Sequence, residues 1–318
     1  MYKEYYTDVD NINESIRDNG VCVIPNVLDE TEITNAIDNK WECLRHFSMG
    51  RLKREDPSTW RDIFNYNPLH SMLLQHYQFG HHQYVWDIRQ NPKVYNIFKT
   101  IWDDDDLLVS FDGVSIHMPH ETTNRGYFRK NIWLHSDQSY QRNDFECIQG
   151  MVTLYDVEEG DATLKVLEGS NKYHGEYAQY RKKNGEECPR EDWFRLEDDG
   201  LRFYKEKGCN EHNILAKAGS LILWDSRTIH QGVEPLRNRE RANHRTVVYV
   251  CMTPRKRAKD KDIRKKQKAF NEMRMTSHWP HKIKLFPKLP RSYGKEMPEV
   301  NVSPPPVLTD LGRRLAGF

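Results

Sequence analysis

The chain has 318 residues, of which 37% are apolar and 30% are charged, enough for one large β core with helices or for two small domains. Its 48 basic and 47 acidic residues give a net charge of +1, so no overall field favours nucleic acid or membrane. No run approaches the roughly 18 apolar residues of a membrane span, and the N-terminus has no apolar signal-peptide region. Six scattered cysteines without a CxxC pair indicate free thiols, so we expect a cytoplasmic protein.

The first part of the chain predicts one strand followed by helices. Residues 21–24 form a short apolar run bounded by turn residues, which is typical of a strand. Residues 30–47 predict a helix with one buried face, because apolar residues recur at helical spacing after Asp29 and Glu32, which are placed to cap its start. A further helix is predicted over residues 92–101.

From residue 107 the pattern changes to short strands separated by turn residues, which indicates an antiparallel barrel or sandwich. The predicted strands cover residues 107–119, 147–157, 162–169, 212–217, 220–226, 228–234 and 244–252. A basic helix over residues 255–275 and an extended tail with many prolines follow. We therefore expect a mainly β (α+β) domain over residues 1–254 and an extension over residues 255–318 that packs on it.

An HxD pair, His135 and Asp137, gives the first indication of chemistry. Alternate residues of a strand point the same way, so this imidazole and this carboxylate converge on one point. His230 lies about a hundred residues later in a second predicted strand. If the two strands are neighbours, the three side chains form the two-histidine, one-carboxylate triad of non-haem Fe(II) oxygenases. An HxD pair alone is common by chance, so the prediction of a metal site depends on the order of the surrounding motifs.

Arginines after His230 supply a second indication. A 2-oxoglutarate that chelates a metal through its keto-acid end needs a buried cation, best a guanidinium, for its far carboxylate. Arg241 has the commonest spacing for this role, whereas Arg245 directly begins an apolar strand. Both stay candidates, and Arg237 and Arg239 are expected in a solvated loop.

Several of these segments resemble the phytanoyl-CoA dioxygenase family of Fe(II)- and 2-oxoglutarate-dependent oxygenases, over roughly residues 15–252. WLHSDQSY resembles the family's HxDQ metal motif, and AKAGSLILWDSRTIHQG is similar to its Gly-Asp turn and distal-histidine strand. IQGMVTLYDVEEGDATLKVLEGSNKYHG resembles its central strands, although Glu168 and Asn171 replace the usual proline and histidine.

The resemblance implies a double-stranded β-helix (jelly-roll, cupin-like) core flanked by helices. It implies His135, Asp137 and His230 as iron ligands, and Arg241 or Arg245 as the anchor of 2-oxoglutarate. The implied cofactors are Fe(II), 2-oxoglutarate as co-substrate and O₂, and ascorbate is compatible with them. The implied reaction hydroxylates an unidentified organic substrate and releases succinate and CO₂.

The substrate is not indicated by the sequence. A small molecule is expected, while the basic segment 255–275 leaves nucleic acid and protein substrates open; the oligomeric state is not indicated. Ser115, His117, Trp133, Tyr140 and Trp224 are candidates for the pocket or the core around it.

Two alternatives come from other classes of protein. A non-catalytic jelly-roll protein would bind only a ligand or partner, and an intact triad argues against it. A cupin-type metalloenzyme without 2-oxoglutarate would favour HxH patterns, which the sequence lacks.

Overall fold

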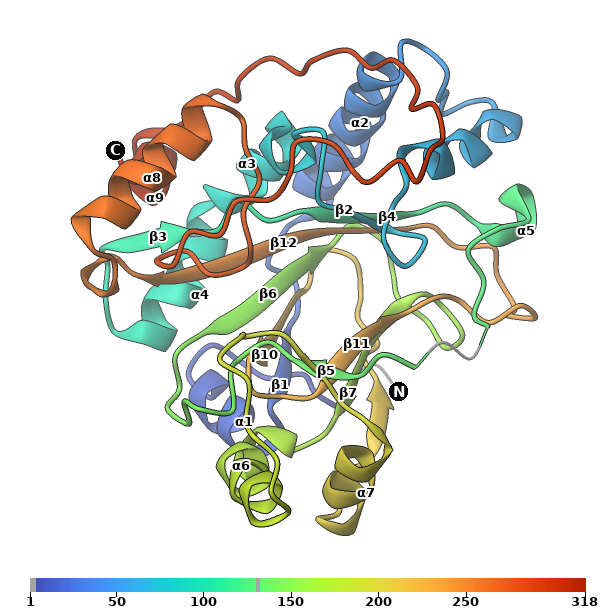
Figure 1. The fold of residues 1–318 in the computed structure, drawn as a ribbon. Coiled ribbons are helices and arrows are strands. Elements are labelled where there is room, and N and C mark those ends of the chain that lie inside the picture. Colours follow the sequence, from blue (N-terminus) through green and yellow to red (C-terminus); the bar gives the residue numbers. More distant parts are fainter. Residues whose placement is uncertain (1–3, 130–131) are drawn as a thin grey trace.

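The core consists of two antiparallel β-sheets, shown in Figure 1 for the computed structural model, which describes residues 4–129 and 132–318. The larger sheet runs in the order β1 (Val21–Ile24), β10 (Leu221–Asp225), β6 (Ile148–Thr153), β12 (Arg245–Pro254), β4 (Val114–His117) and β2 (Leu73–Leu74), with β3 (Leu107–Val109) paired to β12. The smaller sheet runs in the order β8 (Phe194–Arg195), β5 (His135–Ser136), β11 (His230–Val233), β7 (Thr163–Leu167) and β9 (Glu211–Asn213). This confirms the predicted jelly-roll core.

Helices cover the larger sheet and the far end of the smaller one (Figure 1). Those of the first hundred residues are α1 (Ile12–Asn19), α2 (Glu30–Phe47), α3 (Gln83–Arg89) and α4 (Pro92–Trp102), with the 3₁₀ turns η1 (Pro57–Tyr66) and η2 (Phe79–His81). The later ones are α5 (His120–Thr123), η3 (Ser170–Tyr173), α6 (His174–Lys183), α7 (Asp198–Glu206), η4 (Arg255–Arg257), α8 (Asp260–Asn271) and α9 (Asp310–Leu315). Apolar side chains of α2, α3 and α4 form one large core cluster with the larger sheet.

Helix α2 begins and ends as the sequence predicts. The backbone nitrogen of Asp29 donates to Glu32 Oε2 at 2.9 Å, and the backbone nitrogen of Glu32 donates to Asp29 Oδ1 at 3.0 Å. This reciprocal cap satisfies two amide groups that a helix start leaves without partners. Trp41 and Leu44 lie on the buried face, as their spacing predicts.

Helices α1, α5, α6 and α7 were not predicted. The basic segment also differs from the prediction, because helix α8 covers only part of residues 255–275. One of its lysines, Lys266, is fully buried and its ammonium group contacts the carbonyl oxygen of Val109. This helix therefore packs against the core with a basic residue on its inner face.

Between α8 and α9 the chain has no further regular helix, and it lies along the core. The backbone nitrogen of Tyr77 donates to Lys288 O at 2.9 Å, and that of Asn301 donates to Phe47 O at 3.0 Å. The division of the chain into two parts at residue 254 stays a prediction. Residues 1–3 of the first part lie outside the described residues. Across residues 4–129 and 132–318, no helix combines the length and apolar character that a membrane crossing requires.

Candidate metal centre

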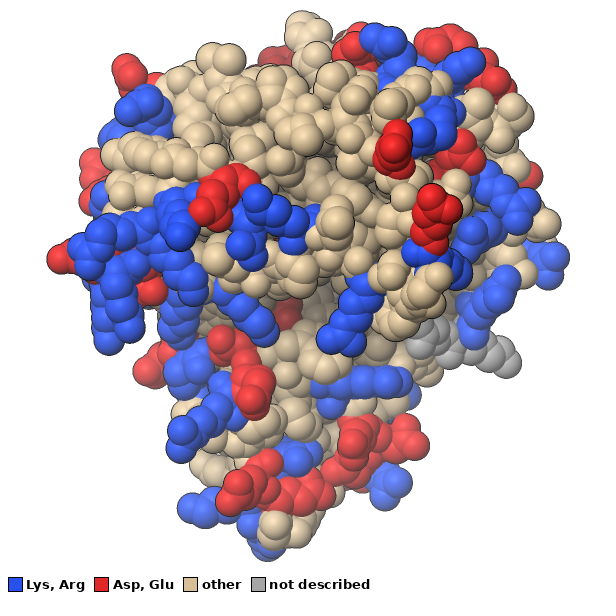
Figure 2. All heavy atoms as spheres, turned by 45° about the horizontal axis from the view of Figure 1, so that its top comes forward, with Lys and Arg blue, Asp and Glu red and all other residues tan. Residues whose placement is uncertain are grey.

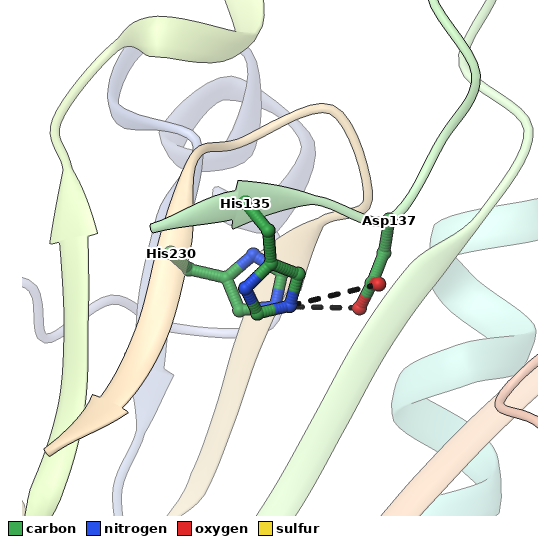
Figure 3. A group of neighbouring side chains, drawn as sticks. All are labelled: His135, Asp137 and His230. Carbon is green, nitrogen blue, oxygen red and sulfur yellow. Dashed lines mark ion pairs between the residues drawn. The ribbon is translucent and has the colours of Figure 1, made fainter. Parts of the chain in front are cut away.

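The three predicted ligands meet at the middle of the smaller sheet (Figure 3). His135 on β5 and His230 on β11 are direct partners across these antiparallel strands, which brings their rings to 4.4 Å between centroids. Asp137 follows β5, and its backbone nitrogen donates to Ser226 O at 2.9 Å. Its carboxylate oxygens lie 3.6 Å from His135 Nε2 and 3.4 Å from His230 Nε2. One ligand atom from each residue lies within 4.8 Å of the others.

These separations suit a shared metal ion. Two ligand atoms held at about 2.1 Å from one ion and at right angles to each other lie about 3 Å apart. The rings are also oriented for binding through Nε2, because His135 Nδ1 faces Trp133 O at 3.1 Å and His230 Nδ1 faces Thr228 O at 2.9 Å. An Nδ1–H that donates to a backbone carbonyl leaves the lone pair of Nε2 free for a metal.

The protonation states also favour metal binding. Burial and the neighbouring His230 lower the pKa of His135, so its imidazole is neutral near pH 7. Burial alone would raise the pKa of Asp137, but His278, His135 and His230 around it lower the pKa well below its ordinary value. A neutral imidazole beside an ionised carboxylate is the state in which these groups bind a cation. Gln149 on β6 further holds the carboxylate, since its Nε2 donates to Asp137 Oδ2 at 2.9 Å.

The triad lies in a cavity of about 1330 Å³. Aromatic and apolar side chains form much of its wall, among them Trp133, Trp224, Trp279, Met151 and Phe286. Figure 2 shows a face of the molecule on which the surface is hollowed and Lys and Arg side chains gather around the hollow. The exposed basic residues that line the cavity are Arg190, Arg257, Lys259, Lys261, Lys282 and Lys284.

Arg245 lies inside the same cavity, at the first position of β12. Only 4% of the residue is exposed, and the described residues provide no carboxylate partner for it. Its Nη1 lies 3.2 Å from Met72 Sδ and its Nη2 lies 3.6 Å from Met151 Sδ, both weak acceptors, while Nε has no partner. Burial lowers its pKa, although Tyr249 acts in the opposite direction. A buried cation without an anion is costly, so this position favours an anionic ligand.

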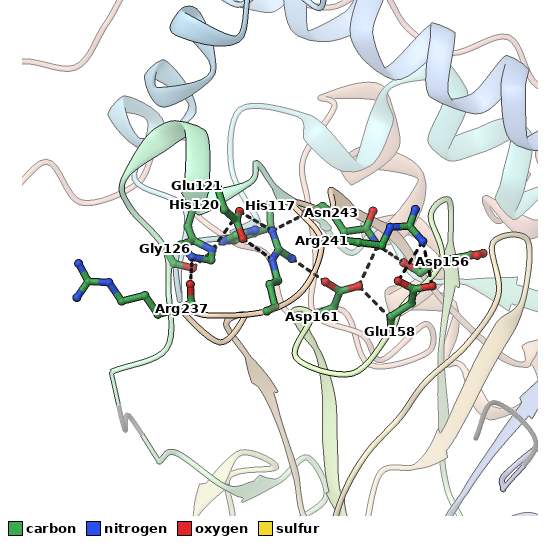
Figure 4. Close-up of polar contacts among 11 residues, drawn as sticks. His117, His120, Glu121, Gly126, Asp156, Glu158, Asp161, Arg237, Arg241 and Asn243 are labelled. Carbon is green, nitrogen blue, oxygen red and sulfur yellow. Dashed lines mark hydrogen bonds and ion pairs between the residues drawn. The ribbon is translucent and has the colours of Figure 1, made fainter.

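Arg241 lies elsewhere, on the loop before β12, with 69% of its side chain exposed. Its Nη1 is 3.2 Å from Glu158 Oε1, as Figure 4 shows, and it does not line the cavity. Arg241 and Arg245 thus do not lie on one continuous strand. The prediction of a solvated loop was wrong for Arg239, whose side chain is only 2% exposed and pairs with Glu121 and Asp161 at 2.7 Å.

The other predicted pocket residues divide between the cavity and the core. Ser115, Trp133 and Trp224 line the cavity, whereas Tyr140 belongs to a separate apolar cluster. His117 is not among the residues that line the cavity, and its Nε2 lies 2.7 Å from Gly126 O.

Sequence reasoning missed three cavity residues. Gln149 lies in the segment that resembles the family's central strands but had no predicted role. His70 precedes the predicted β region; its ring stacks on Trp133 at 3.7 Å between centroids, and burial lowers its pKa to about 4. His278 comes from the C-terminal extension, and its Nδ1 lies 4.0 Å from Asp137 Oδ2. Only the fold brings these residues to the triad.

Comparison with known proteins agrees with this geometry. The phytanoyl-CoA dioxygenase (PhyH) family profile matches residues 16–239, and the chain belongs to this family. It is therefore a non-haem iron enzyme that depends on 2-oxoglutarate, with Fe(II), 2-oxoglutarate and O₂ as its cofactors.

Individual relatives support the same fold. The chain is 27% identical over 290 residues, 88% of each chain, to "Ava biosynthesis cluster protein O" of Aspergillus versicolor. A putative oxidoreductase from Salmonella typhimurium matches with a TM-score of 0.63 and 12% identity, covering 99% of this chain and 86% of that one. A hypothetical protein from Escherichia coli matches with a TM-score of 0.62 and 14% identity, covering 99% and 85%.

Proposed function

We propose that this protein is a dioxygenase that hydroxylates a small organic molecule and converts 2-oxoglutarate to succinate and CO₂. His135, Asp137 and His230 are the proposed iron ligands, and Arg245 is the proposed anchor of the far carboxylate of 2-oxoglutarate. Arg241 is not retained for this role, because its guanidinium is exposed and paired with Glu158. Ascorbate stays a prediction.

The observation that carries the proposal is the presence of two complementary groups in one cavity. The triad offers three ligand atoms to a cation, and the guanidinium of Arg245 has no anion among the described residues. A dianion that chelates a metal at one end and carries a free carboxylate at the other satisfies both. A protein that only bound an apolar ligand would have no need for this costly buried cation.

The protein's own residues hold and orient the reactants. The carbonyl groups of Trp133 and Thr228 fix the rings of His135 and His230, and Gln149 fixes the carboxylate of Asp137. When bound, the iron with 2-oxoglutarate supplies the activation of O₂ that the side chains cannot perform. The aromatic wall keeps water from the reacting centre and positions the substrate beside it.

The basic residues at the cavity favour the approach of an anionic molecule such as 2-oxoglutarate. Two acidic residues of the cavity lining, Glu146 and Asp192, share ion pairs with Arg142, and Glu146 also pairs with Lys282. We place the enzyme in the cytoplasm on the strength of its six unpaired cysteines.

The test combines binding with turnover. Under anaerobic conditions, Fe(II) and 2-oxoglutarate together should give the visible charge-transfer band of a chelate, and neither component alone should give it. With O₂ and a panel of small molecules, succinate should form in step with a hydroxylated product. A band without any succinate would favour a ligand-binding protein, and the absence of the band would favour a metalloenzyme that does not use 2-oxoglutarate.

A further inference from the structure

A segment outside the family match reaches the metal centre. Residues 274–286, here called the strap, follow α8, whereas the family match ends at residue 239. The strap forms a small antiparallel hairpin, with a bridge between Thr276 and Leu285. It carries His278 into the cavity wall, where Nδ1 lies 4.0 Å from Asp137 Oδ2.

The strap is fixed to the core at several points. The backbone nitrogen of Thr276 donates to Phe111 O at 2.9 Å, and Thr253 Oγ1 lies 2.9 Å from His281 Nδ1. Trp279 is buried against Cys147 and Cys251. His278 is therefore held in place before any ligand arrives, which lowers the entropic cost of a contact.

The imidazole of His278 lacks a hydrogen-bond partner. Its side chain is 14% exposed, and its Nε2 is buried without a partner among the described residues. The 4.0 Å to Asp137 is too long for a hydrogen bond. His281, three residues later, has a partner in Thr253. Nδ1 is the ring nitrogen that lies toward the triad, and an oxygen of a ligand bound there would give it the hydrogen-bond partner that Asp137 does not provide.

The distance between His278 and the triad indicates which kind of ligand would supply this hydrogen-bond partner. The group of mutually close ligand atoms contains three residues and does not include His278. An oxygen bound to a metal at about 2.1 Å can accept a hydrogen bond from a nitrogen that lies up to about 5 Å from the metal. His278 is thus not grouped with the expected ligands, but its Nδ1, 4.0 Å from Asp137 Oδ2, is near enough to reach an oxygen bound beside that carboxylate.

We propose that His278 hydrogen-bonds through Nδ1 to the small oxyanion that chelates the metal beside Asp137, so that the strap forms part of the co-substrate site. This inference rests on the proposed function, with 2-oxoglutarate as the oxyanion. It makes His278 a binding residue contributed by the C-terminal extension.

The test compares His278→Ala and His278→Gln with the matched control His281→Gln on the same strap. Each protein is loaded with Fe(II) without oxygen and titrated with 2-oxoglutarate, and the charge-transfer band is followed. Loss of one hydrogen bond to a charged group predicts a Kd at least about tenfold higher for His278→Ala. His278→Gln, which keeps an amide donor at similar reach, should recover part of the affinity. His281→Gln, which keeps a polar partner for Thr253 Oγ1 and so leaves the strap in place, should bind as the wild type does.

Separate measurements keep the outcomes apart. The Kd of Mn(II) alone should be unchanged in His278→Ala, and a large loss would instead make His278 a metal ligand and overturn the inference. An unchanged Kd of 2-oxoglutarate in His278→Ala would also overturn it, as would an equal loss in His281→Gln. A wild-type protein that shows no band would contradict the proposed function itself.

Discussion

Substitution of Arg245 by methionine separates ligand binding from stability. The guanidinium is buried, its Nη atoms lie beside the thioethers of Met72 and Met151, and its other polar neighbour is the uncharged hydroxyl of Tyr249. When 2-oxoglutarate is bound, the substitution would leave its far carboxylate without a cation in a buried site. Truncation of one partner of a buried, hydrogen-bonded charge pair costs about 2–5 kcal/mol. At 1.4 kcal/mol per factor of ten, the Kd of 2-oxoglutarate should rise from about thirtyfold to a few thousandfold.

The same substitution should not destabilise the protein when 2-oxoglutarate is absent. It removes a desolvated charge that has no anionic partner, so the free energy of unfolding in urea should stay the same or increase. The matched control is Arg241→Met, which breaks only an exposed ion pair with Glu158 worth about 0–1 kcal/mol. Its Kd should change less than about fivefold.

Calorimetric titration of 2-oxoglutarate into the Mn(II)-loaded proteins measures both constants. Two results would refute this assignment of Arg245. One is an Arg245→Met variant that binds 2-oxoglutarate with wild-type affinity, and the other is a loss of 2-oxoglutarate affinity in Arg241→Met instead of in Arg245→Met.

Three further predictions concern the metal and the buried histidines. His135→Ala, Asp137→Ala and His230→Ala should each abolish Mn(II) binding in a titration while circular dichroism stays native; retained binding in any of them would remove that ligand. Gln149→Met should weaken Mn(II) binding about 10- to 100-fold, because it releases the carboxylate of Asp137, and a change below twofold would exclude this role. Burial lowers the pKa of six further histidines to about 3 or 4, namely His81, His82, His117, His174, His244 and His281. Since the unfolded chain takes up their protons near pH 6.5, the free energy of unfolding in urea should fall by more than about 3 kcal/mol from pH 7 to pH 5, and a constant value would contradict their neutral burial.

The sequence predicted the features that depend on local patterns. Helix α2 could be located to the residue because its cap, Asp29 with Glu32, and its apolar spacing agree. The convergence of His135 and Asp137 follows from their spacing. The approach of His230 required strands β5 and β11 to be neighbours, and the order of the motifs indicated this correctly.

The sequence did not distinguish the two arginines. Arg241 and Arg245 follow His230 by 11 and 15 residues, both odd numbers, and such a shared parity is informative only along an unbroken strand. Because β12 begins at Arg245, Arg241 falls on the preceding loop, where Glu158 is close enough to pair with it. The residues around Arg241 in the sequence do not indicate that Glu158 lies beside it in the fold.

Contacts from distant segments could not be predicted either. Gln149 contacts Asp137 from the facing sheet, and His278 lies beside it from the extension, and the sequence predicted no role for either residue. The acceptors for the two histidine rings are backbone carbonyls of Trp133 and Thr228, and a sequence carries no side-chain signal for such groups.

The most direct test of the central claim is an anaerobic crystal structure of the protein with Fe(II) and 2-oxoglutarate. We predict one ion bound by the Nε2 atoms of His135 and His230 and by the carboxylate of Asp137, with the far carboxylate of 2-oxoglutarate on the guanidinium of Arg245. An ion bound away from these three residues, or 2-oxoglutarate bound outside the cavity, would contradict the account.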